Sequence, residues 1–237
     1  MSALVLTAHG SKDPRSAANV HAVAGRLRQM RPGLDVQVAF CEQNDPNLVD
    51  ALRGLNDHHQ AVVVPFLLAS AYHARTDIPK QIARAAVSVR QADVLGEDER
   101  LVAVLRERLT ELGVSPADHT LGVLVAAIGS SSPAVNARTA AVAHTLAAET
   151  HWAGAAIGFA TGPLPSVPEA AERLKRRGAR RLAIAPWFLA PGLITDRVLT
   201  FARAAGIAMA QPLGAHELVA ETVLDRYDQA VARQAAA

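Results

Sequence analysis

Short runs rich in valine, isoleucine and leucine alternate along the chain with longer segments whose apolar residues recur at helical spacing. This alternation is typical of βα units in which helices cover both faces of a parallel sheet. The pattern predicts helices between eight strands, near residues 3–8, 35–41, 60–67, 91–95, 120–127, 154–160, 180–188 and 207–212. Capping residues followed by proline predict three helix starts, at Asp13-Pro14, Asp45-Pro46 and Ser132-Pro133.

The second half of the chain repeats the first. "AHGSKDPRSAANVHAVAGRL" from Ala8 aligns with "AIGSSSPAVNARTAAVAHTL" from Ala127, so that Gly10 faces Gly129. "VAFCEQNDPNLVDALRGL" aligns with "IGFATGPLPSVPEAAERL", and "VVVPFLLASAYHARTDI" aligns with "LAIAPWFLAPGLITDRV". The fold class predicted is therefore α/β, with two tandem, duplicated parallel-sheet domains at 1–116 and 117–237 and an active-site cleft between them.

The repeat singles out three ionisable residues that the second half lacks. Each follows a predicted strand of the first half, and its counterpart cannot ionise: His9 faces Ile128, Glu42 faces Thr161, and His73 faces Ile194. A residue that the fold needed would be expected in both copies. Ligands of open parallel sheets bind at the carboxyl ends of the strands, so the three side chains are predicted to converge in a functional site of the first domain.

Two imidazoles and a carboxylate form a facial ligand set for a borderline divalent cation, with coordination positions left open for chemistry. Iron, cobalt, nickel and zinc would all fit such a set. The same groups could instead take up protons, because histidine titrates near neutral pH and burial raises the pKa of a glutamate. Taken singly, each residue could also be structural, for example a hydrogen-bonded histidine at a strand end.

The other histidines and the cysteine are weaker candidates. His58 and His59 are predicted to lie in a solvated loop, and His216 is predicted to cap a helix. Cys41 is expected to be a small buried apolar residue. No partner at a spacing typical of a site is found for His21, His119, His144 and His151.

Composition excludes several classes of protein. Lys and Arg number 24 against 22 Asp and Glu, and only nine aromatic residues (five Phe, two Trp and two Tyr) are present, so no nucleic-acid partner is expected. The single cysteine permits no internal disulfide and fits a cytoplasmic location. The N-terminus lacks the features of a signal peptide, and the longest apolar runs are too short to span a membrane, so no membrane association is expected.

The stretches "LVLTAHGS", "FCEQNDPNL" and "PFLLASAYHARTDIP" resemble those of the sirohydrochlorin chelatases, the ATP-independent metal chelatases of sirohaem and cobalamin synthesis. The likeness extends over nearly the whole chain and includes the duplication of the long members. It implies insertion of a divalent metal into the tetrapyrrole sirohydrochlorin, Fe²⁺ first and Co²⁺ next, by a lyase that acts as a monomer. The metal is then a substrate, and no permanently bound cofactor is expected.

The resemblance also implies roles for particular residues. His9, Glu42 and His73 map onto the metal ligands and catalytic groups. Four residues near them are expected to bind the substrate and its carboxylates, namely Ser11, Lys12, Arg75 and Lys80. Two other classes remain open: a non-catalytic metal or tetrapyrrole carrier, and a histidine-phosphatase-like phosphohydrolase. The latter is weakened by Ala8, which stands where the phosphatase motif has its phosphate-binding arginine.

Overall fold

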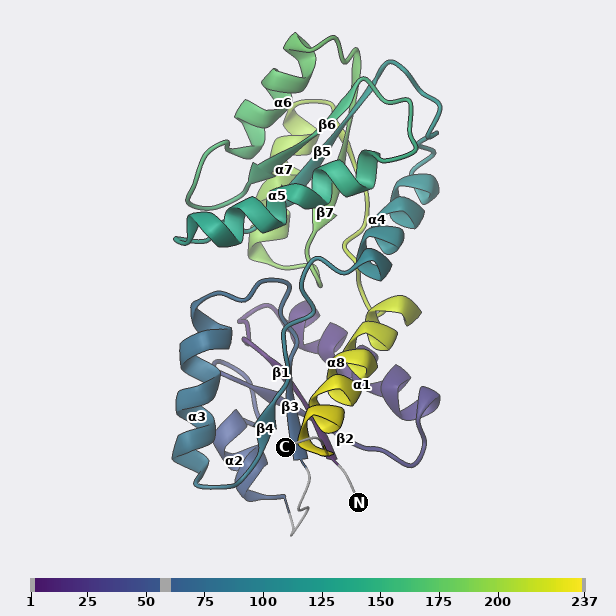
Figure 1. The fold of residues 1–237 in the computed structure, drawn as a ribbon. Helices are drawn as coiled ribbons and strands as arrows, with labels where there is room; N and C mark the ends of the chain where they lie inside the picture. The colour runs from purple at the N-terminus through teal and green to yellow at the C-terminus, as the bar shows by residue number, and fades with distance from the viewer. Residues whose placement is uncertain (1–2, 56–60, 236–237) are drawn as a thin grey trace. The chain divides into compact units, whose positions relative to one another are not determined.

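The computed structural model describes residues 3–55 and 61–235 and forms two compact units (Figure 1). Unit 1 consists of Met1–Asp98 together with Ala215–Ala237, and unit 2 consists of Glu99–Gly214. His58 and His59 lie outside the described residues. No helix in the described part of the chain is both long enough and apolar enough to cross a membrane.

Unit 1 is built on a four-stranded parallel sheet in the order β2-β1-β3-β4. The strands are β1 (Ala3–Ala8), β2 (Asp35–Phe40), β3 (Ala61–Pro65) and β4 (Arg90–Gln91). All four predicted strands are present, although β4 is a two-residue edge strand where a longer one was expected. The β1 and β3 strands are fully buried, as the unbroken apolar runs predict.

Helices cover both faces of this sheet. One face is covered by α1 (Pro14–Met30) and α8 (Glu217–Ala235), and the other by α2 (Leu48–Arg53) and α3 (Ile78–Ala85) (Figure 1). The core under α2 and α3 includes Val5, Leu48, Leu52, Val63 and Ile78.

The predicted helix starts are confirmed in part. Asp13 caps α1, where its carboxylate accepts a hydrogen bond from the Arg15 backbone N–H and Pro14 is the first helical residue. The prediction at Asp45-Pro46 is wrong, because α2 begins at Leu48 and the side chain of Asn47 is its cap.

Unit 2 repeats the architecture with a parallel sheet in the order β6-β5-β7-β8. Its strands are β5 (Leu121–Ala127), β6 (Gly154–Phe159), β7 (Arg181–Trp187) and β8 (Ala208–Met209). Its helices are α4 (Glu99–Glu111), α5 (Pro133–Ala147), α6 (Val167–Arg176) and α7 (Leu193–Ala204). As predicted, α5 begins at Pro133, but the Ser132 side chain makes no capping hydrogen bond.

The strand registers of the two sheets establish which residues correspond. Ala8 pairs with Phe40 in unit 1, and Ala127 pairs with Phe159 in unit 2. In the same way Thr7 pairs with Pro65, and Ala126 pairs with Pro186. Carried along the chain, these registers place the second-half counterparts of His9, Glu42 and His73 at Ile128, Thr161 and Ile194, as the sequence alignment predicts.

The compact units do not coincide with the predicted halves 1–116 and 117–237. The last helix of the first half, α4, packs in unit 2 against α5 and β7, and the last helix of the second half, α8, packs in unit 1 against α1 and β3. The two halves therefore exchange their final helices, a feature that a comparison of local sequence patterns does not reveal.

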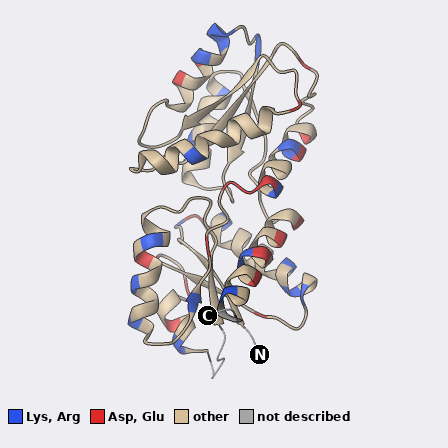
Figure 2. Ribbon diagram, viewed as in Figure 1, with Lys and Arg blue, Asp and Glu red and all other residues tan. Residues whose placement is uncertain are grey.

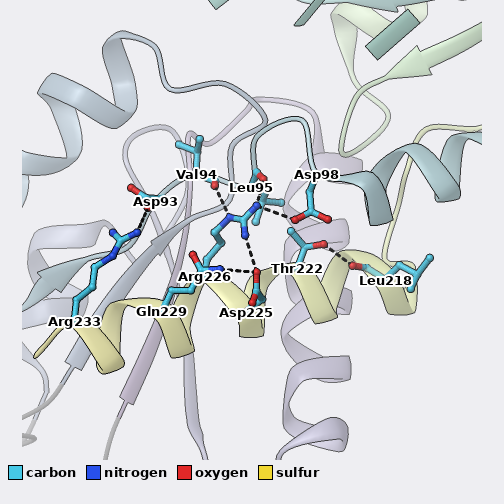
Figure 3. A network of polar contacts seen from close by, with 10 residues as sticks. All are labelled: Asp93, Val94, Leu95, Asp98, Leu218, Thr222, Asp225, Arg226, Gln229 and Arg233. Carbon is cyan, nitrogen blue, oxygen red and sulfur yellow. Dashed lines mark hydrogen bonds and ion pairs between the residues drawn. The ribbon is translucent and has the colours of Figure 1, made fainter. Parts of the chain in front are cut away.

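Equivalent arginines hold the exchanged helices. Arg226 on α8 donates to the backbone carbonyl groups of Val94 and Leu95 and pairs with Asp98 at 2.9 Å (Figure 3). Arg108 on α4 donates to the carbonyl group of Leu213, which is the repeat counterpart of Leu95. Each arginine is thus bonded to the segment that follows the last strand of the unit it joins.

Charged residues are distributed over several elements of both units (Figure 2). The largest run of basic residues on a single helix is at the end of α6, where Arg173, Lys175 and Arg176 occupy the last turns.

Candidate active site

The three ionisable residues that the repeat singles out lie at one edge of the unit 1 sheet. His9 directly follows β1, Glu42 lies two residues beyond β2, and His73 begins the helical segment after β3. In this sheet β1 lies between β2 and β3. The chain passes from β1 to β2 on one side of β1 and then to β3 on the other side, so the topological switch point of the sheet lies between β1 and β3. Open parallel sheets bind their ligands at this point, outside the carboxyl ends of the strands.

Backbone contacts hold the first two residues together. The Cys41 N–H donates to the Ala8 carbonyl oxygen at 2.9 Å, and the Glu42 N–H donates to the His9 carbonyl oxygen at 3.0 Å. These bonds continue the β1–β2 ladder past the ends of the strands. The side chains of His9 and Glu42 are therefore brought side by side, with 3.2 Å between His9 Nε2 and Glu42 Oε1.

Gly10 makes this approach possible. It has a φ of +98°, and a Cβ atom built on it would lie 1.7 Å from the carbonyl oxygen of Glu42. A side chain is therefore excluded both by the conformation and by the space. A Cβ atom on the repeat counterpart, Gly129, would likewise lie 2.1 Å from the carbonyl oxygen of Thr161. Both halves keep this glycine because the fold needs it, whereas only the first half keeps the histidine before it.

His73 completes the group from the other side of the switch point. Its ring centroid lies 4.0 Å from that of His9, with 36° between the ring planes. It opens a π-helical segment, His73–Asp77. Such segments are rare and often occur at functional sites. The neighbouring Tyr72 ring is 61% exposed and meets His73 edge to face.

Asp77 is a member of the group that the sequence analysis missed. Its Oδ2 atom lies 2.6 Å from Nδ1 of His73. A carboxylate that accepts the Nδ1–H bond of a histidine fixes the tautomer and leaves Nε2 free to bind a metal or a proton. The signal was present in the sequence, because a spacing of four residues places His73 and Asp77 on the same face of a helical turn.

The environment of His9 favours its neutral form. Burial lowers the pKa of His9 from its ordinary value of 6.5, and the neighbouring His73 lowers it further, against the opposing effects of Glu42 and Asp77. The Nδ1 atom of His9 is buried and has no hydrogen-bond partner among the described residues. An unpaired ring nitrogen on a neutral imidazole keeps its lone pair and can accept a proton.

The side-chain nitrogen and oxygen atoms of this group are close together, but they are not arranged around a common point. Within residues 3–55 and 61–235, no set of three or more His, Cys, Asp or Glu side chains has the geometry to hold a metal ion. The reason is that these side chains pair with each other: His9 with Glu42, and His73 with Asp77. Binding an ion would require the His9–Glu42 contact to open. Cys41 offers no thiolate, since burial raises its pKa to about 11. It packs against the core but is only partly buried, where the sequence predicts a buried residue.

The four predicted substrate-binding residues lie in the same segments but differ in what they contact. The Ser11 hydroxyl accepts a bond from the Asp13 N–H, and the Ser11 N–H donates to Asn44 Oδ1, so Ser11 shapes the turn. Arg75 is exposed and donates to Ser70 Oγ. Lys12 and Lys80 are exposed and have no polar partner in the described part of the chain.

Unit 2 has apolar or neutral side chains at the matching places. Ile128 is 52% exposed, and Ile194 packs against the core. For His119 and His151 the sequence shows no partner at a spacing typical of a site, and in unit 2 their ring centroids lie 5.3 Å apart. His21 contacts the Phe40 ring, and Nδ1 of His216 accepts the Leu218 N–H, which confirms its predicted capping role.

Comparisons with known proteins identify similar chains and a similar fold. A sirohydrochlorin ferrochelatase of Priestia megaterium is 27% identical over 208 residues, which cover 84% of this chain and 77% of that protein. A sirohydrochlorin cobaltochelatase of Sulfurisphaera tokodaii is 34% identical over 116 residues, which cover 47% of this chain and 94% of that protein. The structure of SirB from Bacillus subtilis with Fe³⁺ superimposes with a TM-score of 0.83 at 21% identity, covering 99% of this chain and 97% of that one.

A family model described as CbiX matches the chain twice, over residues 3–112 and again over residues 122–230. The two matches correspond to the two halves of the sequence repeat. Together they span most of the sequence, and the fold agrees with that of the chelatase structures. The chain belongs to the CbiX family.

Proposed function

We propose that this protein is a sirohydrochlorin chelatase that inserts a divalent metal, Fe²⁺ or Co²⁺, into the tetrapyrrole without ATP. The observation that carries the proposal is the convergence of His9, Glu42 and His73 at the switch point of unit 1, together with the loss of all three in unit 2. Relatives named as ferrochelatases and as cobaltochelatases support both metals.

The chemistry of metal insertion suits these groups. The metal must be held with coordination positions open, and two protons must leave the pyrrole nitrogens as the ion enters. His9 is held neutral by its surroundings, and His73 is oriented by Asp77, so each offers a lone pair that can bind the cation or accept a proton. Glu42 supplies a third ligand or base. The three residues are proposed as the metal-binding and catalytic groups.

Exposed cations beside the site are proposed to bind the carboxylates of the tetrapyrrole. Lys12 follows the turn after β1, and Arg75 and Lys80 lie on the helical segments after β3. Arg75 can bind a carboxylate through two parallel bonds, whereas the lysines act as point charges. Ser11 is proposed to support Lys12 by shaping the turn.

The test is an anaerobic absorbance assay with sirohydrochlorin and Fe²⁺, Co²⁺ or Ni²⁺, which compares the wild-type chain with the His9→Ala variant. Metallation faster than the protein-free rate, and lost in the variant, is expected. A folded chain that binds the metal or the tetrapyrrole without accelerating metallation would instead be a carrier. The duplication places both α/β halves on one chain, so we also expect a monomer, which light scattering after size-exclusion chromatography would measure.

A further inference from the structure

Two histidines lie together at the amino edge of the unit 2 sheet. His119 lies two residues before β5, and His151 lies three residues before β6. The strands pair in parallel, with Gly122 opposite Gly154, so the segments that enter them are neighbours. The two imidazole centroids are 5.3 Å apart, and the ring planes are inclined by 46°.

Hydrogen bonds connect the two segments on both sides of this pair. The His151 N–H donates to the Pro116 carbonyl oxygen at 2.7 Å, and the Ala153 N–H donates to that of Leu121 at 2.8 Å. The Trp152 indole N–H donates to the Ser115 carbonyl oxygen at 2.9 Å. The backbones that carry His119 and His151 are therefore fixed relative to each other.

The spacing of the rings suits a shared metal ion. Two imidazoles bound to one tetrahedral cation with metal–nitrogen distances of about 2 Å have ring centres roughly 5 Å apart. The separation of 5.3 Å between His119 and His151 is close to this value.

The surroundings decide which ions would bind. Both rings are exposed, so water can complete the coordination. The neighbouring Asp118 carboxylate is already engaged by Thr120 and by Arg181 at 3.0 Å, and no third His, Cys, Asp or Glu in the described residues completes a set. Imidazole ligands without carboxylates favour Co²⁺, Ni²⁺, Cu²⁺ and Zn²⁺ over Mg²⁺ and Ca²⁺.

The repeat shows that the pair is particular to the second half. By the strand registers the first-half counterpart of His151 is Pro32. The fold forms in unit 1 with a proline at this position. This pair is therefore not a requirement of the fold.

We propose that His119 and His151 form a second metal site, a two-histidine surface site for a divalent transition-metal ion with water as the remaining ligands. The site lies at the amino edge of its sheet, whereas Ile128, the counterpart of His9, follows the carboxyl end of β5. The proposal does not depend on the chelatase function, because it rests only on contacts within unit 2.

The test uses Ni²⁺ alone, with the fluorescence of Trp152 as the readout. Trp152 directly follows His151, whereas the other tryptophan, Trp187, is only 3% exposed. The full chain is titrated with Ni²⁺ in a His9→Ala background, which removes the candidate catalytic site. Saturable quenching is expected, and the Trp152→Phe variant identifies which tryptophan reports it.

His119→Gln and His151→Gln are each expected to weaken this binding by at least about tenfold, because each removes one of two protein ligands. His144→Gln, at an exposed histidine of α5 in the same unit, is the matched control and should leave the titration unchanged. Circular dichroism establishes that every variant is folded. Absence of quenching in the parent chain, quenching in both glutamine variants equal to that of the parent, or an equal loss in the His144→Gln control would each overturn the proposal.

Discussion

The Nδ1 atom of His73 lies 2.6 Å from the Oδ2 atom of Asp77, four residues further along the chain. The contact joins the first and last residues of the π-helical segment, so the conformation of the backbone sets the orientation of the ring. A histidine held in this way has one defined nitrogen, Nε2, available to bind a metal ion or a proton.

Asp77→Asn tests this relationship. The amide keeps the shape of the side chain but no longer favours the Nδ1–H tautomer of His73, so Co²⁺ affinity is expected to fall by about 10- to 100-fold. An anaerobic titration followed by Co²⁺ absorption measures the effect. Asp228→Asn is the matched control, because it breaks an exposed ion pair with Arg31 at 2.6 Å in the same unit. Equal affinities in the two variants would show that Asp77 does not position His73.

His9→Ile gives unit 1 the residue that unit 2 has at the same position. Metallation of sirohydrochlorin is expected to fall more than about 100-fold, since the change removes a ligand itself and not only its support. Thermal unfolding should be little affected, because Ile128 is tolerated in the second copy of the fold. A variant that unfolds at a much lower temperature would instead assign His9 a structural role.

From the lowered pKa of His9 we predict how the stability of the chain depends on pH. Below its ordinary value of 6.5 the unfolded chain takes up the proton, while the folded chain still holds His9 neutral. The stability that neutral His9 contributes is therefore full above pH 6.5 and is lost as the pH falls toward the lower folded value. Urea unfolding at about pH 7.5 and about pH 5 should show a larger loss for the wild type than for His9→Ile. A His9 pKa at or above 6.5, measured by NMR in the folded chain, would contradict this.

Gly10→Ala is expected to disrupt the site and the fold together. The positive φ alone costs on the order of 1–3 kcal/mol for alanine, and the contact with the Glu42 carbonyl oxygen adds to it. Gly25→Ala is the control: Gly25 lies within α1, and a Cβ atom added there would meet no heavy atom within 4 Å. That change should stabilise the chain by about 0.5–1 kcal/mol. Chemical denaturation measures both, and similar effects would argue against the close approach at Gly10.

We expect two arginines of α8 to contribute very different amounts to stability (Figure 3). Arg226 is largely buried and binds two carbonyl groups and two carboxylates, so Arg226→Leu should lower the free energy of unfolding by about 3 kcal/mol. Arg233 pairs with Asp93 at 2.9 Å in an exposed position, and Arg233→Leu should cost less than about 1 kcal/mol. Equal losses in denaturant titrations would mean that Arg226 does not hold the helix.

Much of this arrangement could be predicted from the sequence because it depends on local patterns. The apolar runs predict the buried strands, and the comparison of the two halves identifies His9, Glu42 and His73 as the residues that only one half needs. Strands that run parallel must bring their carboxyl ends to one edge, so convergence follows from topology.

The features that could not be predicted depend on contacts between distant segments. The sequence of α8 resembles that of α4, and nothing local in either helix shows that each packs on the other unit. The pairing of His119 with His151 likewise follows from strand order and not from spacing along the chain. The cap of α2 is Asn47 and not the predicted Asp45, because the turn after β2 extends two residues further than the Asp-Pro signal indicates.

The exchange of helices has a consequence for the synthesis of the protein. Every element of unit 2 lies within residues 99–214, so unit 2 can fold as soon as that segment has left the ribosome. Unit 1 starts before unit 2 in the sequence, yet it lacks α8 until the segment after unit 2 has been synthesised. The part of the protein that carries His9, Glu42 and His73 is begun before unit 2 and completed after it, and a nascent chain that stops before α8 would leave a face of its sheet, beside α1, uncovered.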